Sequence, residues 1–319
     1  HKAVREGAGM FDVSHMGQVL VEGKDAWAFL QYVNCNNIKN TPGAGTYSHM
    51  LTERGTIIDD LIAFCLTPEK FLVVVNAACR EEDVAWLQKH APRFNVRVTD
   101  VSDQYGMIAV QGPHAVEKLS RVLGDVNGVA RFHITPVVFE GAHGYLTRTG
   151  YTGEDGAEVM LAPEATVKLW DALLKEGVKP CGLGARDVLR LEAGYLLNGQ
   201  DADQSRTPYE ANCGWVVKLA KEDFIGKPVL AEQKAKGVQQ KLTAFRLSGA
   251  GVPRTGCKVF VNAQEAGTIT SGTFSPLFKG IAVGYAQAGL AEGTAVEIEI
   301  HGRRIPAQVV KTPFYKNRV

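Results

Sequence analysis

Two adjacent aspartates stand inside an otherwise apolar run, GTIIDDLIAF, at residues 55–64. Transfer of an ionised carboxylate into an apolar interior is costly unless the carboxylate is paired or hydrogen-bonded. Because neighbouring side chains of a strand point to opposite faces, Asp59 and Asp60 are expected on opposite sides of this segment. Either both acids are solvated in a turn, or one is held by hydrogen bonds while the other faces a pocket and handles protons. The spacing alone does not choose between Asp59 and Asp60.

Three further segments carry residue types that catalysis uses. TRTGYTGEDGAEV, residues 147–159, surrounds a tyrosine with glycines and acids. It has neither GxGxxG nor a Walker lysine, so a turn between two strands is the simpler interpretation. In GLGARDVLRLEAGYLLNGQD, residues 182–201, Arg186 and Arg190 are four apart and share one helix face. His15, in VSHMGQ, has no evident catalytic partner in the sequence.

Hydrophobic periodicity predicts the elements that position these segments. Apolar runs at residues 57–66 and 71–75, joined by TPEK, predict a β-hairpin, and residues 107–110 predict another strand. The predicted helices span residues 26–33, 81–90, 163–177 and 185–197. From about residue 241, short alternating runs separated by Gly-rich turns predict a small all-β domain, a sandwich or a barrel.

Length and composition narrow the class of protein. A chain of 319 residues favours two or three domains. A formal net charge of +1 gives no electrostatic basis for a nucleic-acid or anionic-membrane partner, and no apolar run approaches the roughly 18 residues that a membrane helix needs. Six cysteines without CxxC or metal-ligand spacing indicate reduced thiols in a cytosolic or organelle-matrix setting. The start at HKAVREGAGMF fits a processed chain or a fragment.

Eight segments occur in an order that resembles the aminomethyltransferases, the T proteins of the glycine cleavage system. They are MFDVSHMGQ, GTIIDDLI, VVNAACREEDVAWL, AVQGP, RTGYTGEDGAEVML, KPCGLGARDVLRLEAGYLLNGQDAD, WVVKLAKEDFIGK and TSGTFSPLFKGIAVGYA. The resemblance extends to PFYKNR and so covers essentially the whole chain. Family members have a few dozen residues before the point that matches His1, so the resemblance implies that this chain is a fragment.

The resemblance implies an α+β fold with three domains in a cloverleaf around a central folate cavity. Residues 1–17 and 103–205 would form the first α+β domain, and residues 18–102 and 206–238 the second. Residues 239–319 would form a C-terminal β-barrel domain, in agreement with the alternating runs in that part of the chain.

The implied reaction moves the aminomethyl carbon from the S-aminomethyldihydrolipoyl H protein to tetrahydrofolate. The products are 5,10-methylenetetrahydrofolate, ammonia and the dihydrolipoyl H protein. The lipoylated H protein is the implied partner and tetrahydrofolate the co-substrate, without a metal, in a bacterial cytoplasm or a mitochondrial matrix. The alternative is a folate-dependent demethylase of a methylated amine or sulfonium compound. A non-enzymatic folate-binding relative carries a KGCYxGQE-type motif, and Cys213 lies in no such motif.

The resemblance also selects site residues. Asp60 matches the family's key acid, and a carboxylate there can orient a folate ring nitrogen and accept its proton, with burial moving its pKa toward the working range. Glu192 matches a second acid, which can accept hydrogen bonds from the pterin. The other positions that match the folate site are Met16, Tyr47, Asn76 and Tyr151, with Lys221 or Arg318 near the folate tail.

Overall fold

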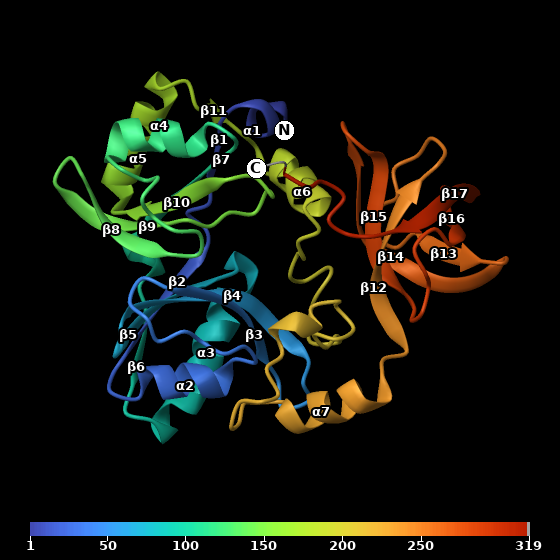
Figure 1. Cartoon of the computed structure of the whole chain (residues 1–319), viewed down its shortest axis with the longest axis horizontal. Helices are drawn as coiled ribbons and strands as arrows, with labels where there is room; N and C mark the ends of the chain where they lie inside the picture. Colours follow the sequence, from blue (N-terminus) through green and yellow to red (C-terminus); the bar gives the residue numbers. More distant parts are fainter. Residues whose placement is uncertain (318–319) are drawn as a thin grey trace. The chain divides into compact units, whose positions relative to one another are not determined.

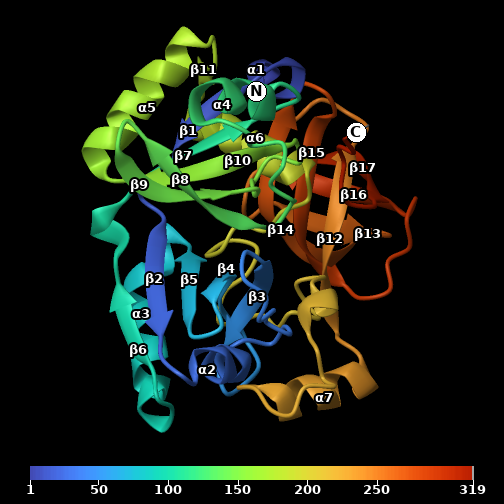
Figure 2. The same cartoon turned by 60° about the vertical axis from the view of Figure 1, so that its left-hand side comes forward.

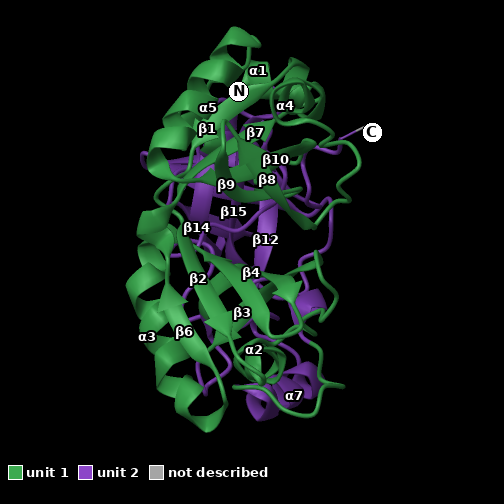
Figure 3. Ribbon diagram, turned by 90° about the vertical axis from the view of Figure 1, so that its left-hand side faces the viewer, with its two compact units in different colours: residues 1–51, 58–186, 218–225 green, residues 52–57, 187–217, 226–319 purple. Residues whose placement is uncertain are grey.

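The chain folds into three β-sheet assemblies with helices packed against two of them, drawn from two directions in Figure 1 and Figure 2. The computed structural model describes residues 1–317. These residues form two compact units, coloured separately in Figure 3. Unit 1 comprises residues 1–51, 58–186 and 218–225, and unit 2 comprises residues 52–57, 187–217 and 226–319. Each unit is therefore built from several separate stretches of the chain.

The first sheet of unit 1 has six strands in the order β11-β1-β7-β10-β9-β8. The strands are β1 (Gly9–Asp12), β7 (Gly106–Gln111), β8 (Ile134–Phe139), β9 (Ala142–Thr147), β10 (Gly156–Leu161) and β11 (Lys179–Pro180). The helices α4 (Ala115–Leu123) and α5 (Pro163–Lys175) bury Leu119 and Leu169 against it, and α1 (Lys2–Glu6) precedes β1. The glycine-rich segment 147–159 makes the turn between β9 and β10, as predicted.

The second sheet of unit 1 has five strands in the order β3-β4-β5-β2-β6 (Figure 2). The strands are β2 (Gly17–Glu22), β3 (Gly45–Leu51), β4 (Ile57–Thr67), β5 (Lys70–Val75) and β6 (Arg97–Asp100). The helices α2 (Ala26–Val33) and α3 (Arg80–His90) cover one face, where Phe29 and Leu87 share a core with Ala63 and Val73. Short 3₁₀ turns occur at η1 (Ala77–Cys79), η2 (Ala91–Arg93) and η3 (Ser102–Gln104).

The register of this sheet aligns residues from separate segments at one end. In the antiparallel β4–β5 pair, Ile62 lies opposite Val74, so the same register brings Asp60 opposite Asn76. The strand β2 begins at this end of the sheet, one residue after Met16. Residues that are far apart in the sequence therefore meet beside the paired aspartates.

Unit 2 contains a closed six-stranded barrel in the order β12-β15-β14-β13-β16-β17. Its strands are β12 (Gln240–Leu247), β13 (Lys258–Val261), β14 (Gln264–Ser275), β15 (Lys279–Gln287), β16 (Ala295–Ile300) and β17 (Arg303–Val310). Phe245, Ile269 and Ile298 fill its core. Before the barrel come α6 (Leu183–Glu192), whose first residues belong to unit 1, then η4 (Gly214–Val216) and α7 (Lys227–Lys236).

The helix α6 ends five residues earlier than predicted, because a glycine terminates it. Gly194 has a left-handed φ of 74°. Its N–H donates to the carbonyl of Leu191 at 3.0 Å, and the N–H of Tyr195 donates to the carbonyl of Arg190 at 2.9 Å. These two bonds are the Schellman motif, which satisfies the last carbonyls of a helix. The prediction that this helix reaches residue 197 is therefore wrong.

The other main predictions agree with the structure. The helix at residues 26–33, the hairpin of β4 and β5, and the all-β C-terminal domain are all present, so the α+β fold with a C-terminal barrel is confirmed. The boundaries of the three expected domains stay a prediction. Within residues 1–317, no helix is long and apolar enough to cross a membrane.

Candidate active site

The two adjacent aspartates of β4 lie in different environments, as alternation along a strand requires. Asp59 shares its face with Leu61 and Ala63, which pack into the core beneath α2 and α3, and it is fully buried. Asp60 is half-buried and points to the opposite face. Only Asp60 can therefore meet a ligand without disrupting the core.

Asn76, which directly follows β5, holds both carboxylates. Its backbone N–H donates to Asp59 Oδ2 at 2.9 Å, and its side-chain Nδ2 donates to Asp59 Oδ1 at 2.8 Å. The same Nδ2 lies 2.9 Å from Asp60 Oδ1. The amide thus fixes the position of the two acids relative to each other, since it bonds to both.

Tyr47 supplies a second hydrogen bond to Asp60 from the neighbouring strand. Its hydroxyl donates to Asp60 Oδ2 at 3.0 Å and lies 3.1 Å from His49 Nε2. Tyr47 and His49 are two residues apart in β3, so both side chains are on the same face of the strand. His49 is fully buried, and burial lowers its pKa to about 3, so the ring is neutral.

The surroundings of Asp60 bring its pKa to a value that is useful for proton transfer. Burial and the negative charge of Asp59 raise the pKa of Asp60 to about 7, against the hydrogen bonds from Tyr47 and Asn76, which lower it. An acid with such a pKa exchanges its proton near neutral pH, where general acid–base catalysis is most effective. Each carboxylate oxygen also has two lone pairs, so Asp60 can accept a further bond from a ligand.

A third acid, Asp83 on α3, lies behind Asp59. Asp83 is fully buried, and within the described part of the chain no N–H or O–H group donates to either of its oxygens. Burial, followed by the charge of Asp59 and a hydrogen bond to it, raises the pKa of Asp83 to about 10. The raised pKa indicates that Asp83 holds its proton at neutral pH, beside the buried carboxyl of Asp59.

Glu192 is the last residue of α6 and belongs to unit 2. It is fully buried, and Ser275 Oγ donates to its Oε1 at 2.5 Å. Ser275 ends β14, and its Oγ accepts the N–H groups of Leu277 and Phe278, each at 3.0 Å. Because those N–H groups occupy the lone pairs of the hydroxyl, its proton points to Glu192 and orients the carboxylate.

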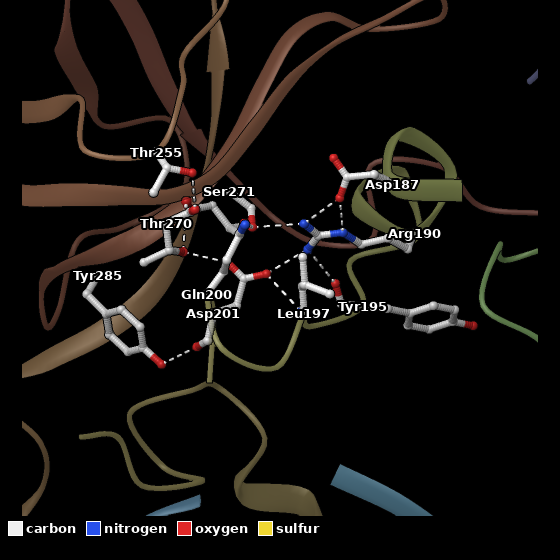
Figure 4. A network of polar contacts seen from close by, with 11 residues as sticks. Asp187, Arg190, Tyr195, Leu197, Gln200, Asp201, Thr255, Thr270, Ser271 and Tyr285 are labelled. Atoms are coloured by element: carbon white, nitrogen blue, oxygen red, sulfur yellow. Dashed lines mark hydrogen bonds and ion pairs between the residues drawn. The ribbon is translucent and has the colours of Figure 1, made fainter. Parts of the chain in front are cut away.

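A buried arginine two residues before Glu192 anchors the end of α6 to the barrel (Figure 4). Arg190 donates to Asp201 Oδ2 at 2.6 Å and to Ser271 Oγ of β14 at 2.8 Å. Asp201, also fully buried, accepts a further bond from Thr270 Oγ1 at 2.5 Å. This network fixes the helix end that carries Glu192.

Met16 and Tyr151, which the resemblance also selects, are both half-buried in unit 1. Met16 precedes β2 at the same sheet end as Asn76. Tyr151 lies in the turn between β9 and β10, with the guanidinium of Arg186 4.7 Å from the centre of its ring. Arg318 lies outside the described residues. Asp60 contacts two of the other predicted residues directly, Tyr47 and Asn76.

Lys221 has a structural environment that the sequence did not indicate. Its ammonium group donates to the carbonyls of Gln31, Asn34 and Asn36 at 2.7, 2.6 and 2.7 Å. These carbonyls lie at the C-terminal end of α2 and just beyond it, where a cation is favoured by the helix dipole. The three protons of the ammonium group are thereby used, so we leave Lys221 out of the folate contacts proposed below.

Three residues that sequence reasoning missed support the predicted acids: His49, Asp83 and Ser275. Two of them carried a signal. His49 follows Tyr47 by two positions, which is the spacing of side chains on one face of a strand. Asp83 is spaced with Leu87 and His90 along the buried stripe of α3. Nothing in the local sequence marks Ser275. Among the described residues, no cluster of three or more His, Cys, Asp or Glu side chains could hold a metal ion.

Comparisons with known proteins agree with this fold. The family model described as "GCVT N-terminal domain" matches residues 1–221, and the "Glycine cleavage T-protein C-terminal barrel domain" model matches residues 240–316. The chain is 44% identical to the aminomethyltransferase of Thermotoga neapolitana, over 99% of this chain and 89% of that protein. The aminomethyltransferase of a Picosynechococcus strain has the same identity and coverage.

A solved structure gives the same result. The glycine cleavage system aminomethyltransferase T of Bartonella henselae superposes with a TM-score of 0.93 and 34% identity, covering 99% of this chain and 88% of that one. The chain therefore belongs to the glycine cleavage T-protein family, the family of folate-dependent aminomethyltransferase enzymes.

Proposed function

We propose that this enzyme transfers the aminomethyl carbon from the S-aminomethyldihydrolipoyl H protein to tetrahydrofolate. The products would be 5,10-methylenetetrahydrofolate, ammonia and the dihydrolipoyl H protein. The observation that carries the proposal is Asp60, a half-buried acid with a pKa of about 7, held between Asn76 and Tyr47 in a chain of this family.

The described residues suit a folate co-substrate. Tetrahydrofolate supplies the two nitrogens that receive the one-carbon unit, N5 of the pterin ring and the exocyclic N10. In our proposal Asp60 orients one of these nitrogens and accepts its proton. General acid–base catalysis of this kind typically increases a reaction rate by about 10²–10⁴-fold. Asn76 and Tyr47 fix the Asp60 carboxylate, so that little reorganisation is needed when the proton moves.

Glu192 is the second acid of the proposal. A buried carboxylate that accepts a hydroxyl proton from Ser275 still has lone pairs, and it can accept the amino and ring N–H groups of a pterin. We further propose that Met16 and Tyr151 provide apolar contacts to the cofactor. Arg318 stays a candidate for the folate tail.

We propose the lipoylated H protein as the partner, because the donor carbon of this reaction is carried on its lipoyl sulfur. The relatives reported above are bacterial, so we propose the cytoplasm as the compartment of a bacterial chain and the mitochondrial matrix for a eukaryotic one.

The test is a transfer assay with the purified chain, tetrahydrofolate and aminomethylated H protein. We expect methylenetetrahydrofolate and ammonia to form in equal amounts from this donor. A parallel series with methylated amines and a methylated sulfonium compound tests the demethylase alternative. Turnover of those compounds without turnover of the H protein would overturn the proposal.

The role of Glu192 predicts a loss of folate affinity. Glu192→Ala removes the acceptor, and hydrogen bonds to a charged group contribute about 1.5–3 kcal/mol, so we expect the Kd for tetrahydrofolate to rise roughly 10- to 100-fold. Titration calorimetry measures this Kd. The matched control is Glu164→Ala in the first turn of α5, which should bind as the unaltered chain does. An unchanged Kd in Glu192→Ala would remove this residue from the site.

A further inference from the structure

A buried histidine stands behind the tyrosine that contacts Asp60. His49 Nε2 is 3.1 Å from the hydroxyl oxygen of Tyr47, and that hydroxyl is 3.0 Å from Asp60 Oδ2. The two rings meet edge to face, with their centres 5.5 Å apart. His49 is fully buried, and it belongs neither to the acids nor to the cofactor contacts proposed above.

The directions of these two hydrogen bonds follow from a count of protons. The ionised carboxylate of Asp60 can only accept, so the single proton of the Tyr47 hydroxyl is donated to it. The Tyr47 oxygen must then accept in the contact with His49. A neutral imidazole carries one proton, which is therefore on Nε2 of His49 whenever Asp60 is ionised.

We propose that His49 is a positioning residue: its Nε2–H group holds the Tyr47 hydroxyl so that the hydroxyl proton is directed at Asp60. This inference rests on the proposed function in taking Asp60 as the acid of the reaction. His49 itself touches neither the co-substrate nor the reacting atoms in this proposal. It acts through Tyr47 on the proton affinity of Asp60.

The consequence for Asp60 has a definite sign. A hydrogen bond donated to the ionised carboxylate lowers its pKa, so loss of the fixed Tyr47 hydroxyl raises that pKa. Among the described residues, the titratable groups that act on Asp60, directly or through Tyr47, are Asp59 on the same strand, Tyr47 and His49 on β3, and Asp83 on α3. The charge of Asp59 raises the pKa of Asp60, and Asp83 holds its own proton at neutral pH. Tyr47 is therefore the titratable neighbour that lowers the pKa of Asp60.

The first test measures this pKa directly in the full chain. The carboxyl carbons of aspartate are labelled with carbon-13, the Asp60 signal is assigned by its loss in Asp60→Asn, and its midpoint is followed by NMR. His49→Leu removes the donor, whereas His49→Gln places an amide nitrogen near the position of Nε2. We expect the midpoint to rise in His49→Leu and to stay close to the unaltered value in His49→Gln.

The matched control is His90→Leu, which removes another buried histidine of unit 1. The His90 ring packs against Trp86, with ring centres 4.7 Å apart, and has no contact with Tyr47 or Asp60 among the described interactions. Thermal melts of all variants establish that each is folded. A folded His49→Leu variant with an unchanged Asp60 midpoint would overturn the proposal, as would a midpoint that rises equally in His90→Leu.

The second test uses a double-mutant cycle. Because His49 acts through the Tyr47 hydroxyl, Tyr47→Phe should raise the Asp60 midpoint by itself, and adding His49→Leu should raise it no further. Additive shifts would show that His49 acts on Asp60 by a separate route and would contradict the proposal.

Turnover separates this inference from the proposed function. At a pH below the midpoint we expect kcat of His49→Leu to fall on the order of 10-fold with little change in KM for tetrahydrofolate, since about one hydrogen bond to a charged group is lost. His49→Gln should recover most of the rate. If the unaltered chain shows no transfer, the proposed function fails, while the carbon-13 titration still decides the role of His49.

Discussion

The adjacent residues Asp59 and Asp60 differ in burial and in hydrogen-bond partners because they lie on opposite faces of β4. Asp59 faces the helices, is fully buried and accepts two bonds from Asn76. Asp60 faces away from the helices and keeps partial access to solvent. The charge of Asp59 is one of the two causes that raise the pKa of Asp60. Asp59 therefore raises the pKa of the acid that the proposed reaction uses, although the two carboxylates do not share a face of the strand.

The first prediction at this scale concerns the acid itself. Asp60→Asn keeps the size of the side chain but removes the proton acceptor, so we expect turnover to fall by about 10²–10⁴-fold with the fold intact. Turnover and circular dichroism of the purified variant check this. Asp59→Asn is the comparison: it disturbs the buried contacts with Asn76 and should lower the free energy of unfolding more than Asp60→Asn does. Turnover of Asp60→Asn near that of the unaltered enzyme would contradict the assignment.

The second prediction concerns pH. A proton acceptor must be ionised, so kcat/KM should rise with pH and level off above about 7, the pKa of Asp60. Stability should follow the opposite course. Between about pH 4 and 7 the Asp60 carboxyl keeps its proton in the folded state, whereas in the unfolded state, with an ordinary pKa of 3.8, it has lost the proton. The contribution of Asp60 to the free energy of unfolding therefore decreases as pH rises from about 4 to about 7.

Both halves of the pH prediction can be measured. A pH–rate profile gives the limb near 7, and urea unfolding of the enzyme and of Asp60→Asn at a series of pH values gives the stability difference. The variant should gain stability relative to the unaltered chain as pH rises through this window. A rate profile that is flat between about pH 5.5 and 8.5 would exclude Asp60 as the titrating group.

The sequence predicted the acids better than their supports. Alternation along β4 placed Asp59 and Asp60 on opposite faces, and the family resemblance selected Asp60. The same rule of alternation, applied to Tyr47 and His49, would have placed these two side chains together. Asp83 lies in the first turn of α3, where the helix dipole favours acids, so its type and position there do not distinguish a buried acid from a solvated one. Ser275 reaches Glu192 across 83 positions of sequence, which no local pattern reports.

At the scale of elements, the ends of strands and helices carry the chemistry. Asn76 follows β5, Glu192 ends α6 and Ser275 ends β14. The sequence predicted most of these elements, because apolar spacing is a property of a local window. The predicted end of α6, residue 197, is too late, because apolar spacing continues to Leu197 beyond the glycine that adopts a left-handed conformation at residue 194. Terminal contacts depend on distant partners, and local periodicity does not contain them.

Lys221 provides the prediction at this scale. Lys221→Met leaves three carbonyls at the end of α2 without their cation, so we expect the free energy of unfolding to fall by about 2–4 kcal/mol. Urea unfolding measures the change, and Lys218→Met, at an exposed lysine three residues earlier, is the control. A variant of unchanged stability that binds tetrahydrofolate more weakly would restore Lys221 to the folate site that the resemblance implied.

At the scale of the whole molecule, each compact unit is assembled from three stretches of the chain. The sequence indicated a separate all-β region from about residue 241, and that region is the barrel. It did not indicate that residues 52–57 and 187–217 belong to the same unit as the barrel. Such a grouping depends on long-range contacts like that of Arg190 with Ser271, 81 positions apart in the sequence.

Arg190 therefore gives the prediction for unit 2. Arg190→Met leaves Asp201 as a buried charge without its cation, and breaking a buried ion pair in this way costs about 3–5 kcal/mol. Urea unfolding followed by the fluorescence of the unit 2 residue Trp215 measures the loss. Arg254→Met, at an exposed position of the same unit, should change stability little. The double variant Arg190→Met with Asp201→Leu should recover part of the loss, and no recovery would contradict an uncompensated charge as its cause.

The closed barrel has a consequence for how other chains can associate with this protein. Every barrel strand is hydrogen-bonded to a neighbour on both sides, so within the described residues the barrel presents no open row of backbone groups. The outer strand β8 of the six-stranded sheet does have an open side, but it contains Pro136, which lacks an N–H group. A protein that docks on the barrel must recognise side chains and loops, since it cannot extend the barrel by intermolecular strand addition.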